Sequence, residues 1–398
     1  MNLPIPVALP RAALHRRQWL ATVGLGALLS ACGGGSGSDD LPDPEQARLQ
    51  SRASDLVSEG LVGVAMGWAD AREVRTAVAG LRRLGGRALL EPGDLMAIGS
   101  NTKAMTACVA ASVVDQGLLR WDSTLVQVLP GLAREALPLY RSVTLRDLLG
   151  HRAGVMAFTD QADIDAFERQ VGDEALAGLQ QPADRQAFFL RWLLQQPPVR
   201  ATGEIPGYAY SNAGYVLVSR MLAAATGQDW GSLLELRVAK PLGLSLFVGA
   251  PLRQGPNQPA GHAGQGGRLQ PLALPEGMEQ AWLGLLDPAG GVSLRVRDDA
   301  LWLQWHLRAL RGEATPLPPG YVRELLEMAH ATAGNYSLGW VVQARQGAKW
   351  LLHSGAIGGF EALSLVALDG SVAGLAHTNT TTQNSMALLF DSVAALMA

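Results

Sequence analysis

"AIGSNTKAMTACVAASVVDQG", residues 97–117, places a serine three positions before a lysine, in front of an almost wholly apolar run. Positions i and i+3 of an α-helix share one face, so Ser100 and Lys103 would meet at the first turn of a helix. The run behind them has no clear polar stripe, which predicts a helix that is buried on nearly all sides and stops at Gly117. A hydroxyl and an amine buried at that turn would be costly without partners, so this pair is the first candidate site.

The lysine at position 103 is informative because the chain otherwise uses arginine. Of 32 basic side chains, three (Lys103, Lys240 and Lys349) are lysines and the other 29 are arginines. An arginine stays protonated at any relevant pH, whereas burial can lower the pKa of a lysine toward neutrality. Lys103 could therefore accept the proton of Ser100 and make it a nucleophile. Ser-x-x-Lys is nevertheless a loose pattern, and a purely structural role remains open on this motif alone.

A second element is "YAYSNAGY", which contains Tyr210, Ser211 and Asn212. Residues two apart in an extended stretch point the same way, so Tyr210 and Asn212 can face one cleft. A phenol can relay a proton, and a carboxamide can orient a lysine and a substrate carbonyl at once. Taken alone, the same residues would also fit a core tyrosine beside an asparagine that caps a helix.

The third element is "LLHSGAIGGF", in which His353, Ser354 and Gly355 close a β-run. Gly355 would let a substrate approach the backbone closely, and His353 could donate or accept a hydrogen bond across the cleft. The N–H of Ala356, together with that of Ser100, could stabilise an oxyanion. The alternative is a histidine that simply lies at the end of a strand.

In this order and spacing the three elements resemble the serine β-lactamase and penicillin-binding superfamily, over about residues 45–395. The nearest similarity is to class C β-lactamases, D-alanyl-D-alanine carboxypeptidases and related esterases. Seven ordered blocks carry it: "IGSNTKAMTA", "LLRWDSTLVQVLP", "VTLRDLLGHRAG", "YSNAGY", "KPLGL", "PAGGV" and "HSGAIGGF". The resemblance implies an acylated nucleophile at Ser100, with Lys103 as its base or proton relay. It also implies that Tyr210 is the partner base and acid, that Asn212 positions substrate, and that residues 353–356 bind it.

Two departures from the family pattern bear on the substrate. Most β-lactamases of this family carry a lysine where this chain has His353, and a fixed cation there suits a substrate carboxylate. Histidine is mainly neutral at pH 7 unless its pKa is perturbed. This difference favours a peptidase-like or esterase-like enzyme. The usual His-Thr-Ser-Gly is "HRAG" at 151–154, so Arg152 reaches either the cleft or solvent.

Hydrophobic patterning predicts an α+β fold in which an antiparallel β-sheet is flanked by terminal helices and a large helical lobe is inserted. The α/β part would comprise about 44–95 and 285–398, and the helical part about 96–284, with the active site at their seam. Expected helices cover 44–60, 212–227, 297–310 and 383–397, and another runs from an N-cap at Thr144 to Gly154. Expected strands cover 61–68, 73–80, 338–345, 349–353, 361–368 and 371–378, and residues 253–277 should form a long loop.

The N-terminus carries export signals. Residues 1–31 have a basic start (Arg11, Arg16 and Arg17) and a short apolar run, which is typical of a signal peptide. "LLSAC" resembles a bacterial lipobox with Cys32 as the lipidated residue, and "RRQWL" resembles a twin-arginine signal. Residues 32–43 would be a lipidated, flexible tether. We therefore expect an exported, periplasmic protein that is anchored by lipid to a bacterial membrane, the outer one. A plain cleaved signal or a chance apolar stretch is the alternative.

Composition restricts the remaining classes. A chain of 398 residues, with 48% hydrophobic and 17% charged residues, has ample material for one large domain or two closely joined ones. The net charge of –3, without a basic run after the N-terminus, argues against nucleic acid as a partner. No zinc-protease motif and no cysteine cluster occur, so neither a metal nor another cofactor is expected. Cys108, inside the apolar helix, should be a buried and inert thiol.

The working hypothesis is an exported, membrane-anchored serine hydrolase that forms an acyl-enzyme on an amide, ester or lactam carbonyl of a small molecule or peptide. The alternative from a different class is a catalytically silent protein on the same fold that binds or senses peptidoglycan fragments. A third is an intracellular enzyme whose leader is spurious. The substrate is not indicated, because the loops at 156–200 and 250–285 would shape its pocket and carry no signature. The oligomeric state is not indicated either.

Overall fold

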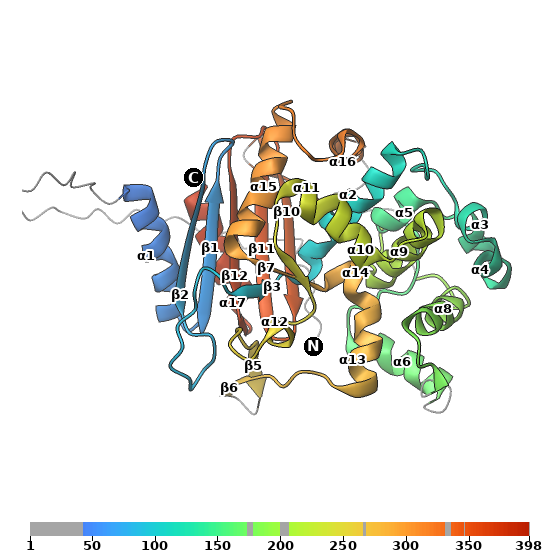
Figure 1. Cartoon of the computed structure of the whole chain (residues 1–398), viewed down its shortest axis with the longest axis horizontal. Helices are drawn as coiled ribbons and strands as arrows, with labels where there is room; N and C mark the ends of the chain where they lie inside the picture. The colour runs from blue at the N-terminus through green and yellow to red at the C-terminus, as the bar shows by residue number, and fades with distance from the viewer. Residues whose placement is uncertain are drawn as a thin grey trace, which may run out of the picture. The chain divides into compact units, whose positions relative to one another are not determined.

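The computed structural model describes residues 43–172, 178–199, 207–265, 268–330, 336–345 and 347–397. The predicted signal peptide, Cys32 and the tether up to residue 42 lie outside these ranges. From Pro44 onward the chain packs as one unit, and its elements can be followed in Figure 1. Within the described ranges, no helix combines the length and the apolar character that crossing a bilayer requires.

A seven-stranded antiparallel sheet forms the centre of this unit, in the order β2-β1-β12-β11-β10-β9-β8. Its strands come from both ends of the described chain: β1 (Gly63–Ala69), β2 (Val74–Gly80), β8 (Tyr336–Ser337), β9 (Trp340–Arg345), β10 (Ala348–Ile357), β11 (Phe360–Ala367) and β12 (Ala373–Thr378). The predicted hairpin and the four predicted C-terminal strands are confirmed. Strand β10 runs four residues beyond its predicted end, because Ser354–Ile357 continue the ladder with β11.

Helices cover both faces of the sheet. α1 (Pro44–Ser58) and α17 (Ser385–Leu396) pack on one face, where Leu56 and Leu389 share a core with Met66 and Leu363. α15 (Val296–Leu310) packs on the other face, between the sheet and the helical part (Figure 1). The predicted α+β arrangement, with terminal helices on one face, is confirmed.

The helical part fills most of the chain between β2 and α15. Its α-helices are α2 (Thr102–Asp115), α3 (Leu125–Val128), α4 (Pro130–Glu135), α5 (Leu145–Leu149), α6 (Gln161–Val171), α8 (Pro182–Leu193), α9 (Asn212–Thr226), α10 (Trp230–Leu234), α11 (Lys240–Leu242), α12 (Pro251–Gln254), α13 (Gly277–Leu283) and α14 (Asp287–Gly290). Short turns of other helix types are η1 (Gly99–Asn101), η2 (Pro138–Ser142), η3 (Glu235–Ala239) and η4 (Gly284–Leu286). α16 (Pro319–His330) follows α15 and packs against α2.

Two three-stranded sheets join this helical part to the central sheet. One has the order β3-β7-β4, from β3 (Leu95–Ala97), β7 (Val292–Arg295) and β4 (Leu246–Val248). The other has the order β13-β5-β6, from β13 (Thr380–Thr381), β5 (His262–Gln265) and β6 (Arg268–Pro271). One continuous core contains residues of the central sheet, such as Leu375, as well as Met105 of α2 and Leu217 of α9. The sheet and the helical part are therefore not independent bodies.

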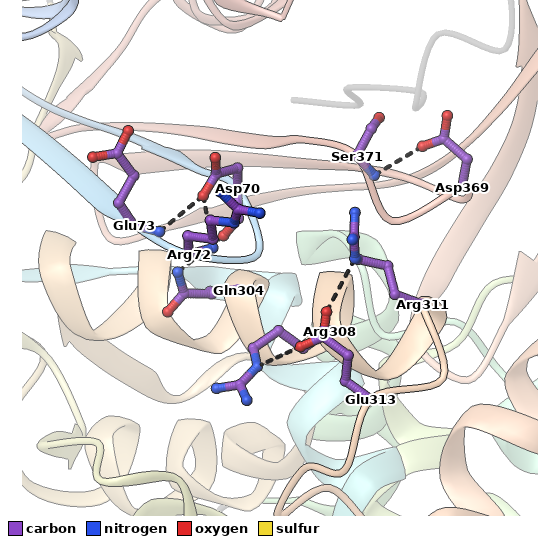
Figure 2. A network of polar contacts seen from close by, with 9 residues as sticks. All are labelled: Asp70, Arg72, Glu73, Gln304, Arg308, Arg311, Glu313, Asp369 and Ser371. Carbon is purple, nitrogen blue, oxygen red and sulfur yellow. Dashed lines mark hydrogen bonds and ion pairs between the residues drawn. The ribbon is translucent and has the colours of Figure 1, made fainter.

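Polar contacts near the start and in the middle of α15 fix this helix to the sheet. Near its start, Asp299 Oδ2 lies 2.8 Å from His377 Nε2 of β12, and both side chains are almost completely buried. Figure 2 shows Gln304 beside the β1–β2 turn and, farther along the chain, Glu313 bound to Arg308 and Arg311. Gln304 Nε2 donates to the carbonyl oxygen of Asp70 at 2.9 Å. These contacts hold α15 in register with the strands beneath it.

Two predicted segments differ in the structure: one helix ends earlier, and one loop contains strands. The helix capped by Thr144 and Asp147 has the expected capping box, but it ends at Leu149 and not at Gly154. His151 has a φ of +57°, in the left-handed region, which turns the chain away from the helix axis. Residues 253–277 contain β5 and β6 as well as loop, because β5 pairs with the edge strand β13.

Candidate active site

Ser100 lies in η1, the single 3-10 turn that joins β3 to α2. Gly99 has a φ of +50°, a conformation that glycine adopts without steric cost, and it directs the chain from the strand into the turn. α2 is buried along nearly its whole length, as its uniform apolar surface predicts, and Gly117 follows just after its end. Ser100 itself is partly exposed, so its hydroxyl remains open to a substrate.

Lys103 is completely buried, and its amine contacts three oxygen atoms. Nζ lies 3.1 Å from Ser100 Oγ, 2.7 Å from Asn212 Oδ1 and 2.9 Å from the carbonyl oxygen of Ala289. Burial lowers the pKa of the amine well below its usual value of 10.5, because an ammonium ion loses its hydration in the interior. A neutral amine has two N–H groups and one lone pair. The two carbonyl-type oxygens can only accept, so the lone pair is left for the Ser100 hydroxyl.

Tyr210 approaches the same pair from a segment that is distant in the sequence. Its phenol hydrogen-bonds to the Ser100 side chain, and its ring centroid lies 4.7 Å from Lys103 Nζ. Burial raises the pKa of Tyr210, and the hydrogen bond with Ser100 only partly offsets this effect. The phenol therefore keeps its proton near neutral pH while it contacts the Ser100 side chain.

Asn212 is the first residue of α9, and its carboxamide bridges two segments. Oδ1 accepts from Lys103, while Nδ2 donates to the carbonyl oxygen of Phe158 at 2.7 Å. The helix cap is Ser211, whose Oγ accepts from the Gly214 N–H at 2.9 Å. The alternative in which Asn212 caps this helix is thus wrong. The structure brings Ser100, Lys103, Tyr210 and Asn212 together, as expected.

His353 lies beneath the site and does not project into it. Its side chain is 1% exposed, and both ring nitrogens already have partners. Nδ1 lies 2.7 Å from the carbonyl oxygen of Ser354 and Nε2 lies 3.1 Å from Tyr336 Oη, so Nδ1 must donate and Nε2 must accept. Burial, with the nearby Lys103 amine, lowers the pKa of His353 to about 3. The ring is neutral at ordinary pH and has no free nitrogen for a substrate.

The side chains of residues 353–355 alternate between the two faces of β10. His353 and Gly355 face the helical part, whereas Ser354 shares the opposite face with its partner Leu363. Gly355 has a role in backbone packing. A Cβ there would overlap the carbonyl oxygen of Ile98 and lie 2.8 Å from the Ser100 nitrogen, so the glycine lets β10 pack directly on η1.

The backbone amides of Ser100 and Ala356 lie at this contact between β10 and η1. A Cβ on Gly99 would lie 2.7 Å from the Ala356 nitrogen. Ala356 is exposed and follows the buried Gly355 on β10. The two amides expected to stabilise an oxyanion are therefore held on adjoining, tightly packed backbones.

Four residues that the sequence analysis assigned no role also support the site. Ala289 and Phe158 supply carbonyl oxygens to Lys103 and Asn212, and Tyr336 supplies a hydroxyl to His353. His151 accepts the Ser211 N–H through Nδ1 at 3.1 Å, and its ring centroid lies 4.2 Å from that of Tyr210. Ala289 and His151 lie in the quoted blocks "PAGGV" and "VTLRDLLGHRAG", which could have indicated them. Phe158 and Tyr336 lie in no quoted block.

Other reactive groups lie away from this chemistry. Cys108 is fully buried in α2, and burial raises the pKa of its thiol, which matches the expected inert cysteine. Arg152 is partly exposed and close enough to Tyr208 to oppose the effect of burial on the pKa of that phenol. Among the described residues, no three His, Cys, Asp or Glu side chains gather as metal ligands.

Comparisons with known proteins agree with this geometry. The family model described as Beta-lactamase matches residues 46–396. Penicillin-binding protein 4 of Amycolatopsis lactamdurans is 27% identical over 293 residues, covering 70% of this chain and 70% of that protein. Unguisins hydrolase of Aspergillus campestris is 25% identical over 68% of this chain, which spans 49% of the fungal protein's length. A D-stereospecific amidohydrolase from Streptomyces shares the fold, with a TM-score of 0.63 and 22% identity over 88% of this chain and 99% of that one.

The packing at Gly355 predicts a specific sensitivity. Gly355→Ala should destabilise the protein by about 1–3 kcal/mol, the usual cost of overpacking a core. It should also slow acylation of Ser100 by up to about 100-fold, because a small shift of β10 moves the Ala356 amide relative to Ser100. Urea unfolding and the labelling rate of Ser100 with a fluorophosphonate measure the two effects.

Gly93→Ala is the matched control, because a Cβ at Gly93 meets no atom within 4 Å. It should leave both quantities near their wild-type values. Equal behaviour of the two alanine variants would show that the close approach of β10 to η1 is unimportant.

Proposed function

Since this chain belongs to the beta-lactamase family and is a serine hydrolase, we propose that it cleaves its substrate through an acyl-enzyme on Ser100. The observation that carries the proposal is the environment of Lys103. Its completely buried amine lies 3.1 Å from the Ser100 hydroxyl, and two further oxygens engage its N–H groups. A neutral lysine in this position is a base whose lone pair already faces the proton that it must accept.

Acylation then begins with the Ser100 oxygen attacking the substrate carbonyl while Lys103 takes the hydroxyl proton. The Tyr210 phenol, which is protonated near neutral pH, donates its proton to the leaving amine or alcohol. The phenolate that forms is next to the Lys103 ammonium, which can return the proton to it. In the second step water attacks the acyl-enzyme, and the same pair accepts the proton of the water.

The oxyanion of each tetrahedral intermediate would bind the N–H groups of Ser100 and Ala356. Support for this assignment is the direct packing of β10 on η1, which fixes the two amides before a substrate arrives. Preorganised donors stabilise a developing charge without reorganisation at the moment of reaction. Asn212 Nδ2 has a second N–H beyond the one bound to Phe158, and this group can face a substrate carbonyl.

We propose that the preferred substrates are esters or amides that have no carboxylate beside the reacting carbonyl. A β-lactam or a C-terminal D-alanine presents such a carboxylate. His353 cannot pair with it, because the ring is buried and neutral and both of its nitrogens are engaged. The fold shared with a D-stereospecific amidohydrolase is compatible with an amide substrate.

A substrate panel tests the proposed reaction. The wild-type protein should hydrolyse a p-nitrophenyl ester faster than nitrocefin or a D-Ala-D-Ala peptide, and Ser100→Ala should lose all measurable turnover. Mass spectrometry should find a fluorophosphonate adduct on Ser100 alone. A folded wild-type protein that no acylating probe labels would instead support the silent binding or sensor protein.

The low pKa of Lys103 predicts the pH dependence of acylation. The labelling rate of Ser100 should rise with pH as Lys103 loses its proton, and should reach its plateau well below the usual lysine pKa of 10.5. Lys103→Arg remains protonated and should lose about 100-fold or more, the usual contribution of a general base. The rate of fluorophosphonate labelling against pH measures both effects. An arginine variant with the wild-type profile would contradict the role of Lys103.

We also propose that the protein is exported and lipid-anchored through Cys32. Support comes from the basic start, the apolar run and the "LLSAC" pattern of residues 1–32, followed by the glycine- and serine-rich residues 33–38. Such a tether would let the folded unit act on substrates in the periplasm, near the membrane surface.

An alkyne fatty acid tests the anchor in a bacterial host. The wild-type protein should take up the label and sediment with membranes, whereas Cys32→Ser should do neither. Cys108→Ser is the control and should label normally, because Cys108 is buried in α2. Wild-type protein that stays unlabelled and unexported would support the intracellular alternative.

A further inference from the structure

The carboxamide of Asn212 has a fixed orientation because of the groups on its two sides. Nδ2 donates to the Phe158 carbonyl oxygen at 2.7 Å, and Oδ1 accepts from Lys103 Nζ at 2.7 Å. A carbonyl oxygen can only accept, so it forces the amide nitrogen toward itself and the amide oxygen toward Lys103. The Phe158 carbonyl thus decides that Asn212 offers an acceptor, and not a donor, to the lysine.

Phe158 is held in an unfavourable backbone conformation. Its φ of +50° lies in the left-handed region, which a bulky residue rarely adopts. Its buried ring packs against Phe189, with ring centroids 4.9 Å apart, and against Phe167 and Trp192. Such strain persists only where the surroundings over-determine it, and it concentrates at functional sites.

A carboxylate outside the site binds the backbone N–H of Phe158. Asp163 Oδ2, in the first turn of α6, accepts the N–H of Phe158 at 2.6 Å. Capping of α6 does not require this bond, because Asp160 is the N-cap and its Oδ1 already accepts the Asp163 N–H at 3.3 Å. The contact of Asp163 with Phe158 is therefore additional to the local helix structure.

We propose that Asp163 is a positioning residue for the reaction at Ser100. Its carboxylate fixes the Phe158 backbone, the Phe158 carbonyl orients the Asn212 carboxamide, and Asn212 Oδ1 holds one N–H of Lys103. Lys103 Nζ in turn lies 3.1 Å from Ser100 Oγ. Direct hydrogen bonds therefore connect Asp163 of α6 with the proposed nucleophile. The inference rests on the proposed function, because it assigns Asp163 to that same reaction.

Loss of Asp163 would release the left-handed turn at Phe158. The Asn212 carboxamide could then rotate and present Nδ2 to Lys103, which would compete with Ser100 for the lysine lone pair. The nucleophile would remain in place, but its base would no longer be directed at it. The expected effect is on the rate of acylation and not on the affinity for the reagent.

Three variants separate positioning from stability. Asp163→Ala should lower the maximal rate of fluorophosphonate labelling of Ser100 on the order of 10- to 100-fold, with a nearly unchanged half-saturating concentration. Asp163→Asn keeps an oxygen that can accept the Phe158 N–H and should retain the rate within a few-fold. Asp160→Ala removes the cap of the same helix and should lower the melting temperature, yet label at the wild-type rate.

Two results would overturn the proposal: wild-type labelling by folded Asp163→Ala, or an equal loss of rate in Asp160→Ala. If the wild-type protein is not labelled, the proposed function fails first. Crystal structures of the wild-type protein and of Asp163→Ala then decide the inference separately. Rotation of the Asn212 carboxamide or loss of its bond to Phe158 in the variant supports it, and an unchanged carboxamide refutes it.

Discussion

A completely buried lysine amine is the constraint on which the rest of this structure depends. Water cannot reach Lys103, so the protein must supply an acceptor for each of its N–H groups, and an unpaired charge there would be severely destabilising. The two accepting oxygens come from α9 and α14, and the hydroxyl that faces the lone pair comes from η1. The three segments are far apart in the chain. These segments can satisfy the amine only in one mutual arrangement. The same low-polarity surroundings that demand the partners also lower the pKa of the amine, as the proposed base requires.

A second constraint is the approach of two backbones without side chains between them. Gly355 on β10 and Gly99 on η1 allow strand and turn to pack directly, and this contact joins the central sheet to the helical part at the nucleophile. His353, one position from that contact on the same strand, is neutral and bound on both ring nitrogens. In this chain the position that carries a cation in related β-lactamases thus serves the internal packing of the site. The proposed preference for substrates without a carboxylate follows from this difference in charge.

Local spacing was sufficient to predict much of the site. Ser100 and Lys103 lie three residues apart where α2 begins, and Tyr210 and Asn212 lie two residues apart where α9 begins. The local backbone geometry therefore turns the two side chains of each pair in the same direction. The order of the seven blocks predicted the fold and the meeting of the two pairs. The prediction that the His353 ring bonds across the cleft is wrong, because the ring is buried and both nitrogens have partners. A histidine at this position of a strand can face either a cleft or a core, and only the elements packed on β10 decide which. It also missed β5 and β6, whose pairing depends on the distant edge strand β13.

The amino-acid sequence by itself determined the family, because its seven blocks occur in the order that the family shows. It also determined the central sheet and its covering helices, because their hydrophobic periodicity is local. Only the tertiary structure decided how the Lys103 amine is oriented. The oxygens that orient Lys103 and Asn212 belong to the backbone of Ala289 and Phe158, and every residue type has such a carbonyl. The block "PAGGV" could have indicated Ala289, but the positions of both carbonyl oxygens follow from how α14 and the turn before α6 pack around the buried amine.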